Sequence, residues 1–177
     1  MKKLFYAALC TGSLLLIALL LRVDAQEQSD FVAASAHATS DVPLDILVHI
    51  QDLGDVRGAD NNWIGNRGQE RRIELINIKQ LDGTESIQLR YMCHIGGVGD
   101  TEFMAEGENC GTRGQERRLE GFAIRLVGPE ASNFTVTYSC HVQDIGDFGF
   151  FSDGGFCGTR GQGRRLEALI IRITRLQ

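Results

Sequence analysis

The sequence predicts an all-β domain built from three tandem repeats between residues 44 and 177. Two sequence blocks recur three times, apolar and polar residues alternate where each repeat opens, and stretches rich in Gly, Asp and Asn interrupt the strands. The recurring blocks are residues 49–55, 94–100 and 141–147, and residues 65–74, 111–120 and 158–167. Their offsets are 45 and 47 residues for the first block and 46 and 47 for the second. Because a fixed period of this size is typical of repeat architectures, we divide the region into unit 1 (44–84), unit 2 (85–131) and unit 3 (132–177).

The opening segment of each unit is predicted to be a strand with one buried face. In unit 3 apolar residues alternate with polar ones from Val136 to Val142, and residues 44–50 repeat the pattern in unit 1. A period of two places all the apolar side chains on the same face of a strand.

The closing segment of each unit is predicted to be a more central strand, residues 165–173 in unit 3. Leu166 and Ile170 would lie on one face and Leu169 and Ile171 on the other, and apolar residues on both faces are typical of a central position. Between the two strands lie sequences such as 152–155, Ser-Asp-Gly-Gly, whose residues favour turns. We expect a short hairpin there.

The three units are expected to close around a shared core. A unit of this size cannot shield its own apolar face, whereas three copies about an axis bury a common centre and leave few free sheet edges. Two long strands flanking a short hairpin favour a closed pseudo-threefold, β-trefoil-like domain. A β-prism is the alternative.

The first 25 residues have the features of a secretory signal. Lys2 and Lys3 precede an apolar stretch (4–21), and Val23-Asp24-Ala25 offers small residues at the two positions that a signal peptidase inspects. An uncleaved N-terminal anchor is the alternative, because the stretch approaches the length that spans a bilayer. Residues 26–43 are predicted to be a flexible linker. The domain is therefore expected to be secreted or to lie in the cell envelope or periplasm.

The charge of the exported part disfavours nucleic acid and anionic lipid as partners. Removing residues 1–25 takes Lys2, Lys3, Arg22 and Asp24 from 18 basic and 23 acidic side chains, which leaves 15 and 22 and a net charge of −7. Both classes of partner are bound mainly through clustered Lys and Arg. Apart from an N-terminal anchor, no membrane contact is expected.

The four cysteines of the domain occupy only two repeat positions. They are Cys93 and Cys140, directly before the recurring His, and Cys110 and Cys157, directly before the recurring Gly, where unit 1 carries Val48 and Ile64. Both cysteines are thus present together or both replaced by branched apolar residues. We therefore predict buried Cys93–Cys110 and Cys140–Cys157 disulfides, with four buried free thiols as the alternative. A zinc site is disfavoured because the close Cys and His pairs of such sites are missing.

The repeat resembles a known family, the clostridial hydrophobic repeat with a characteristic Trp, or ChW repeat. The resemblance rests on these segments of unit 3: Tyr-Ser-Cys-His-Val-Gln-Asp-Ile-Gly (138–146), Phe-Ser-Asp-Gly (151–154), Gly-Thr-Arg-Gly-Gln (158–162) and Arg-Leu-Glu-Ala (165–168). It covers all three units, residues 44–177.

The chain departs from the family at the eponymous Trp. Asp55, Asp100 and Asp147 stand at that position, and Phe103 and Phe150 hold a second aromatic position. The family resemblance implies a secreted or surface-attached bacterial protein that serves adhesion or binds polysaccharide or other surfaces, rather than a catalyst.

Candidate ligand-binding residues lie in the loops where the units diverge most. They are Asp60, Asn62 and Trp63 in unit 1, and Phe148, Phe151 and Asp153 in unit 3. Aromatic faces beside short polar side chains suit sugar recognition as well as protein contact. For Phe103 and Phe150, packing in the core beneath the loops is the favoured interpretation.

The recurring polar residues are interpreted as structural. Each unit has a His (His49, His94, His141), a Glu (Glu74, Glu120, Glu167) and an Arg pair before the Glu. Groups that appear three times are expected to hold each unit together, for instance a Glu accepting hydrogen bonds from an Arg or from turn amides. The Gly-Thr-Arg-Gly-Gln run is expected to form a tight turn with positive φ, whose Arg and Gln bind a neighbouring unit.

These observations favour a non-catalytic binding or adhesion module, lectin-like, with a polysaccharide or surface protein as ligand and without cofactor or metal. A self-associating structural protein of the envelope is the alternative. A hydrolase using a His and Glu pair is the least favoured, because no nucleophile motif, metal-ligand set or phosphate loop accompanies these groups.

Overall fold

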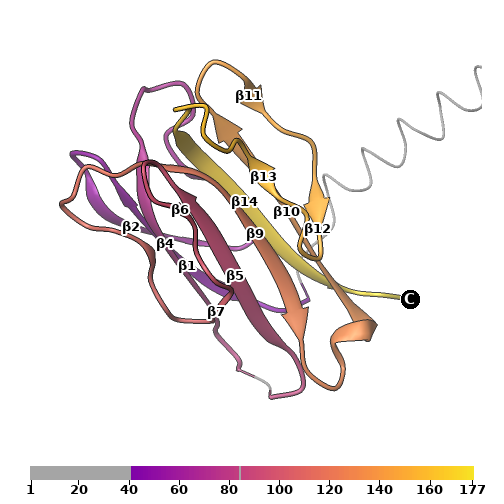
Figure 1. Ribbon diagram of the computed structural model, residues 1–177. Coiled ribbons are helices and arrows are strands. Elements are labelled where there is room, and N and C mark those ends of the chain that lie inside the picture. Colours follow the sequence, from indigo (N-terminus) through magenta and orange to yellow (C-terminus); the bar gives the residue numbers. More distant parts are fainter. Residues whose placement is uncertain (1–40, 84) are drawn as a thin grey trace, which may run out of the picture. The chain divides into compact units, whose positions relative to one another are not determined.

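The computed structural model describes residues 41–83 and 85–177, in which the regular structure is all strand apart from one 3₁₀ turn, η1 (Ala131–Asn133). Six long strands carry the architecture (Figure 1): β1 (Leu44–Ile50), β4 (Ile73–Gln80), β5 (Gln88–Ile95), β9 (Leu119–Val127), β10 (Phe134–Val142) and β14 (Leu166–Arg175). The short strands are β2 (Gly54–Ala59), β3 (Ile64–Gly65), β6 (Gly99–Asp100), β7 (Met104–Ala105), β8 (Cys110–Gly111), β11 (Gly146–Asp147), β12 (Phe151–Ser152) and β13 (Cys157–Gly158). The prediction of an all-β fold is confirmed.

The predicted signal peptide lies outside the described residues, as does the predicted linker up to residue 40. Asp41, which begins the described part, is already bound to the domain: its backbone N–H donates to the carbonyl of Ile173 at 2.8 Å. None of the described residues forms a helix long and apolar enough to cross a membrane.

The two long strands of each unit pair in antiparallel fashion: β1 with β4, β5 with β9, and β10 with β14. The pairing shifts at the same point in every unit, directly after the recurring His49, His94 or His141. A bulge adds an unpaired residue to one strand and redirects the side chains beside it. The recurring His is therefore presented in the same way three times.

The predicted short hairpin between the long strands is wrong. In unit 3, β11 and β12 both pair with β10, and β13 leaves the unit altogether. Units 2 and 1 are built alike, since β6 and β7 pair with β5, and β2 pairs with β1. The Gly-rich stretches let the chain cross from one pairing to the next, instead of folding a hairpin of their own.

The last short strand of each unit pairs with a neighbouring unit. Strand β8 of unit 2 pairs with β4 of unit 1, β13 of unit 3 with β9 of unit 2, and β3 of unit 1 with β14 of unit 3. We call these contacts the 1–2, 2–3 and 3–1 junctions. They yield three antiparallel sheets, with β2-β1-β4-β8 as the order of the first. No sheet of the described residues closes on itself, so the closed β-trefoil-like or β-prism arrangement stays a prediction.

A glycine permits each strand exchange. Gly65, Gly111 and Gly158 have φ between 118° and 124°, where side chains are rarely found. A Cβ on any of them would lie 2.2–2.3 Å from the carbonyl oxygen of the neighbouring unit's buried Glu. Only glycine therefore allows the exchanged strand to come so close.

Both predicted disulfides are confirmed, and each joins two sheets. Cys93 on β5 bonds to Cys110 on β8, and Cys140 on β10 bonds to Cys157 on β13. Because β8 and β13 belong to neighbouring sheets, each bond ties an exchanged strand back to its own unit. The corresponding residues of unit 1, Val48 and Ile64, are buried in the same apolar core.

Candidate functional site

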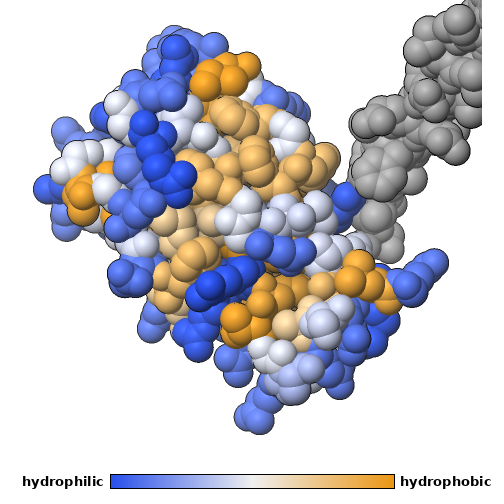
Figure 2. All heavy atoms as spheres, turned by 45° about the vertical axis from the view of Figure 1, so that its right-hand side comes forward, coloured by the Kyte–Doolittle hydropathy of each residue, from blue (hydrophilic) through white to orange (hydrophobic). Residues whose placement is uncertain are grey.

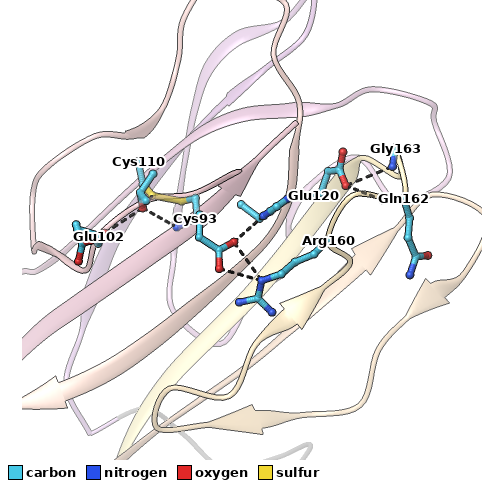
Figure 3. A network of polar contacts seen from close by, with 10 residues as sticks. Cys93, Glu102, Cys110, Glu120, Arg160, Gln162 and Gly163 are labelled. Carbon is cyan, nitrogen blue, oxygen red and sulfur yellow. Dashed lines mark hydrogen bonds and ion pairs between the residues drawn. A yellow bond between two sulfur atoms is a disulfide. The ribbon is translucent and has the colours of Figure 1, made fainter. Parts of the chain in front are cut away.

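The recurring polar residues gather at the three junctions. We call each group a junction cluster: the His, the Asp six residues after it and the Glu of one unit, with the Arg of the Gly-x-Arg-Gly turn of the next. Figure 3 shows the cluster of the 2–3 junction, where Arg160 of unit 3 reaches toward unit 2 and the turn that follows it faces Glu120.

In every cluster a histidine and an arginine share one aspartate. Nδ1 of His49, His94 and His141 lies 2.6–2.7 Å from the Asp of the same unit. The Arg of the next unit donates to the same carboxylate: Arg113 to Asp55, Arg160 to Asp100 and Arg67 to Asp147, at 2.9–3.1 Å. The prediction that this Arg binds a neighbouring unit is confirmed. The sequence predicts no role for the Asp, although its constant spacing from the His is a signal that could have indicated one.

These contacts lower the pKa of two of the aspartates. Hydrogen bonds from Arg113 and then from His49 hold the pKa of Asp55 below its ordinary value. Burial would raise the pKa of Asp100, but hydrogen bonds from His94 and Arg160 outweigh it and the pKa is again lowered. The clusters therefore keep these carboxylates ionised.

The glutamate of each cluster is almost fully buried and already paired. Glu74, Glu120 and Glu167 are 4%, 1% and 2% exposed, and each accepts from the Arg two residues before it at 2.7–3.0 Å. Amides of the next unit's turn also donate to Glu120 and Glu167, among them the N–H of Gly68 to Glu167 at 2.8 Å. This confirms the predicted role, since a buried carboxylate persists only when its lone pairs are satisfied.

A pocket of about 260 Å³ opens beside the cluster of the 3–1 junction. Its lining combines acidic, amide and imidazole groups: Gly68 and Glu70 of unit 1, and His141, Gln143, Asp144, Arg165 and Glu167 of unit 3. Nε2 of His141 lies 3.7 Å from Glu167. Among the described residues no group of three or more His, Cys, Asp or Glu is placed to hold a metal ion.

A family model described as Clostridial hydrophobic W (ChW) matches residues 94–128 and 141–175. These two segments are ChW repeats. They contain the closing strands β9 and β14 and the exchanged strands β8 and β13, and they begin at the recurring His near the end of each opening strand. Neither a curated protein nor a solved structure matches the chain.

The candidate ligand-binding acids of unit 1 and of the second ChW repeat accept hydrogen bonds from backbone amides of the domain. Asp60 accepts the N–H of Leu44 at 2.9 Å, and Asp153 accepts the N–H of Val136 at 3.3 Å and the hydroxyl of Thr135 at 2.8 Å. The exposed Asn62 donates to the carbonyl of Asp60.

The candidate aromatic residues are partly buried. Trp63 lies under the guanidinium of Arg67, 4.7 Å from its ring, while Phe148 and Phe151 pack against the core with ring centroids 6.3 Å apart. In the described part of the chain, no hydrogen bond or ring contact joins the candidates of unit 1 to those of the second ChW repeat.

Phe103 and Phe150 lie over arginines. Arg125 lies 4.1 Å from the ring of Phe103, and Arg172 lies 5.2 Å from the ring of Phe150. Phe150 is 48% exposed, so the expectation that it fills the core is wrong for this residue. The Arg172 and Arg125 positions were missed by the sequence analysis, because they lie outside both recurring blocks.

Proposed function

We propose that this protein is an exported, non-catalytic binding module of the cell surface that recognises polysaccharide. The observation that carries the proposal is the pair of ChW repeats, a repeat module of surface or secreted proteins, in which the recurring charged residues are bound to one another at the junctions. Their use as internal contacts leaves the variable loops as the surface for a ligand.

Export is supported by the two disulfides, because such bonds persist in oxidising compartments. Residues 1–25 would act as the signal peptide. Unit 1 would be a third ChW repeat, since it has the same His and Asp contact, buried Glu and exchanged strand as the two matched units. Asp55 and its two counterparts would then replace the Trp of the family.

A β-prism is the closed arrangement that the strand pairing favours. The three sheets are separate, each contains a strand of the next unit, and the exchange returns from unit 3 to unit 1. A trefoil would need long strands of different units to pair into one barrel.

The burial and pairing of the recurring acids support a non-catalytic role. A general acid or base must reach the substrate, whereas Glu74, Glu120 and Glu167 are buried and paired with Arg. The strongest case for a hydrolase is the pocket of the 3–1 junction, which His141 and Glu167 line. If replacing His141 or Glu167 lowers the melting temperature and has no other effect, the hydrolase alternative is wrong.

The loops of unit 3 offer the most aromatic surface for a sugar. Figure 2, which brings the side of β10 and β12 forward, shows apolar side chains gathered in the middle of that face with charged groups around them. Phe150 is exposed, with Phe148, Phe151 and Phe156 partly buried nearby in the sequence. Aromatic rings bordered by polar groups suit the apolar faces and hydroxyl groups of saccharides.

A glycan array with parallel polysaccharide pull-downs tests the proposal. We expect retention of at least one polysaccharide, weakened about fivefold by Phe150→Ala because a lost stacking contact is worth about 1 kcal/mol. Leu176→Ala, which removes an exposed apolar residue elsewhere, is the matched control. Absence of binding to every glycan and cell-wall fraction would contradict the polysaccharide role.

Self-association is a second candidate, favoured by a repeated apolar residue in the turns after the opening strands. Leu53, Val98 and Ile145 stand at equivalent positions and are 49%, 61% and 48% exposed. Light scattering of the wild type and of a variant with Asp at all three positions tests it. A strict monomer at high concentration in the wild type argues against this function.

A further inference from the structure

Three equivalent rows of side chains lie on the outer faces of the sheets. Each row crosses from the closing strand to the opening strand and on to a short strand. The rows are Lys79, Asp45 and Ala59 in unit 1, Arg125, Arg90 and Ala105 in unit 2, and Arg172, Thr137 and Ser152 in unit 3. We call them outer rows, because the alternate positions of the opening strands point into the core. Their backbone framework is the same, so differences between them come from the side chains.

The outer row of unit 1 contains its own anion, Asp45. Asp45 forms ion pairs with Arg57 and with Lys79, the latter at 3.5 Å. The hydrogen bond from Arg57 lowers the pKa of Asp45 despite some burial. The carboxylate is thus ionised and satisfies both cations.

The outer row of unit 2 carries two positive charges and no negative one. Arg90 and Arg125 are directly opposite each other on β5 and β9. Neither forms an ion pair with an Asp or Glu in residues 41–83 or 85–177. Like charges directly opposite on neighbouring strands destabilise a sheet, so the pair is unfavourable unless an anion lies between the guanidinium groups.

Phe103 places one of the two arginines. The guanidinium of Arg125 lies 4.1 Å from the centre of its ring, and Arg125 remains exposed. Stacking on a ring fixes the plane of a guanidinium while its N–H groups remain free to donate. Because Arg90 stands directly opposite Arg125 in the strand register, both guanidinium groups can donate to the oxygens of one carboxylate or sulfate.

The outer row of unit 3 repeats the contact between an arginine and a phenylalanine ring, but its arginine is buried. Arg172 is only 5% exposed and lies under Phe150, and burial lowers its pKa. Its Nε has no hydrogen-bond partner in the described residues. Thr137 replaces the second arginine, so the outer row of unit 3 has one cation, and that cation is too buried for a ligand to reach. Among the three rows, two facing arginines with one of them exposed therefore occur in unit 2.

We propose that Arg90 and Arg125 form an anion-binding site for the carboxylate or sulfate group of a saccharide, with the Phe103 ring beside it. This inference rests on the proposed polysaccharide binding and names the class of ligand. The exported part is negatively charged overall, so long-range attraction is weak and recognition depends on direct contact with the two guanidinium groups.

The first test measures the melting temperature of the full chain with sodium sulfate and with sodium chloride at equal ionic strength. We expect sulfate to raise the melting temperature by about 4 °C when its concentration is roughly tenfold above Kd. Arg90→Asp copies the outer row of unit 1 by placing an Asp opposite Arg125. It should abolish the sulfate-specific shift without lowering the melting temperature measured in chloride.

Lys79→Ala is the matched control, because Lys79 is the counterpart of Arg125 in a row that already has its anion. This variant should keep the sulfate shift. The anion site would be wrong if sulfate raised the melting temperature equally in wild type and Arg90→Asp, or not at all in wild type. This conclusion would hold regardless of the result for polysaccharide binding.

The second test compares retention on immobilised polygalacturonate, dextran sulfate and neutral dextran. The two acidic polymers distinguish carboxylate from sulfate as the bound group, and we expect Arg125→Ala to weaken retention on the preferred one about tenfold, as the loss of a hydrogen bond to a charged group predicts. Equal retention of Arg125→Ala and wild type on an acidic polymer overturns the inference but leaves the proposed function standing. Loss of sulfate-dependent stabilisation in Arg90→Asp, with no polymer retained by wild type, supports the anion site and contradicts the polysaccharide role.

Discussion

The 3–1 junction differs from the other two in one respect that separates two sources of stability. At the 1–2 and 2–3 junctions a disulfide ties the exchanged strand back to its own unit, whereas at the 3–1 junction unit 1 has Val48 on β1 and Ile64 on β3 at those positions. The exchange glycine, the buried Glu and the shared aspartate recur at all three junctions. In all three junctions the residue after the glycine donates its N–H to the carbonyl of the neighbouring buried Glu at 2.8–2.9 Å.

The comparison shows that the exchange does not require the disulfide. Glycine, buried Glu and bridging Arg recur at every junction, so they define where the exchanged strand pairs. The disulfide limits how far a strand can depart once it opens, because a cross-link restricts the unfolded chain. Strand β3 lacks that restraint, and the pocket beside His141 lies at the same junction.

Reduction of both disulfides should have the largest effect. Each bond closes a segment with a sequence separation of 17 residues, so we expect a loss of about 3 kcal/mol per bond. Urea unfolding in the presence and absence of reductant measures it. Replacing Cys93 and Cys110 by the Val and Ile of unit 1 should lose less than replacing both by Ala, since the apolar pair refills the core. Equal midpoints for reduced and oxidised protein would contradict the role given to the bonds.

Replacement of the exchange glycines should distinguish the two kinds of junction. Gly65→Ala and Gly111→Ala both force a Cβ against a carbonyl oxygen at positive φ, which should cost on the order of 3 kcal/mol each. We expect Gly65→Ala to expose β3 to hydrogen exchange and proteolysis, whereas β8 in Gly111→Ala remains tied by Cys110.

Gly68→Ala is the control for backbone strain alone. Its φ is 68° but a Cβ would meet nothing within 4 Å, so we expect a cost of only about 1 kcal/mol. If Gly65→Ala and Gly111→Ala release their strands equally, the disulfide does not distinguish the junctions.

Neutralising a buried carboxylate should have the next largest effect. In Glu167→Gln the charge that Arg165 and the N–H of Gly68 share is removed while the shape is kept, and we expect a loss of about 2 kcal/mol. Glu120→Gln at the disulfide-bonded 2–3 junction is the matched variant, because Glu120 also accepts from an Arg and from amides of the next unit's turn. Chemical denaturation of both tests whether the 3–1 junction opens before global unfolding, which would appear as a separate, earlier transition in Glu167→Gln alone.

The strands and the disulfides could be predicted from the sequence because each leaves a local or paired signal. Alternation from Val136 to Val142 indicates one buried face, and all four of its apolar residues are buried. The joint replacement of Cys93 and Cys110 by Val48 and Ile64 indicates a bonded pair. The contact between the recurring Glu and an Arg could be predicted because the two lie only two residues apart.

The strand exchange and the outer rows could not be predicted in the same way. Strands β3, β8 and β13 have two residues each, too few to show a period, and their partners lie in other units. Arg90 and Arg125 meet only through the register of β5 and β9. Long-range pairing is set by packing of the whole domain, and a motif search within one unit does not see it.

Removing the bridging arginines should have a small effect. Arg67, Arg113 and Arg160 are 38–47% exposed, and exposed ion pairs contribute about 0.2–1 kcal/mol. Arg67→Ala should nevertheless matter more than Arg113→Ala, because the 3–1 junction has no disulfide and Arg67 also covers Trp63. Differential scanning calorimetry of the two variants compares them, and a larger loss for Arg113→Ala would contradict the ranking of the junctions.

Acid should weaken the 1–2 and 2–3 junctions through Asp55 and Asp100. Their pKa values are lowered in the folded protein by the His and Arg that bind them, so the unfolded state takes up protons first as the pH falls. Their contribution is therefore complete above the ordinary Asp pKa of about 3.9 and declines below it, as the pH approaches the lowered folded values. Arg113→Ala removes the hydrogen bond that lowers the pKa of Asp55 most. The free energy of unfolding, measured at a series of pH values, should therefore fall less steeply below about pH 4 in this variant than in the wild type. If the acid dependence of stability is unchanged in Arg113→Ala, the contact with Arg113 does not lower the pKa of Asp55. The electrostatic contribution assigned to the 1–2 junction would then be wrong.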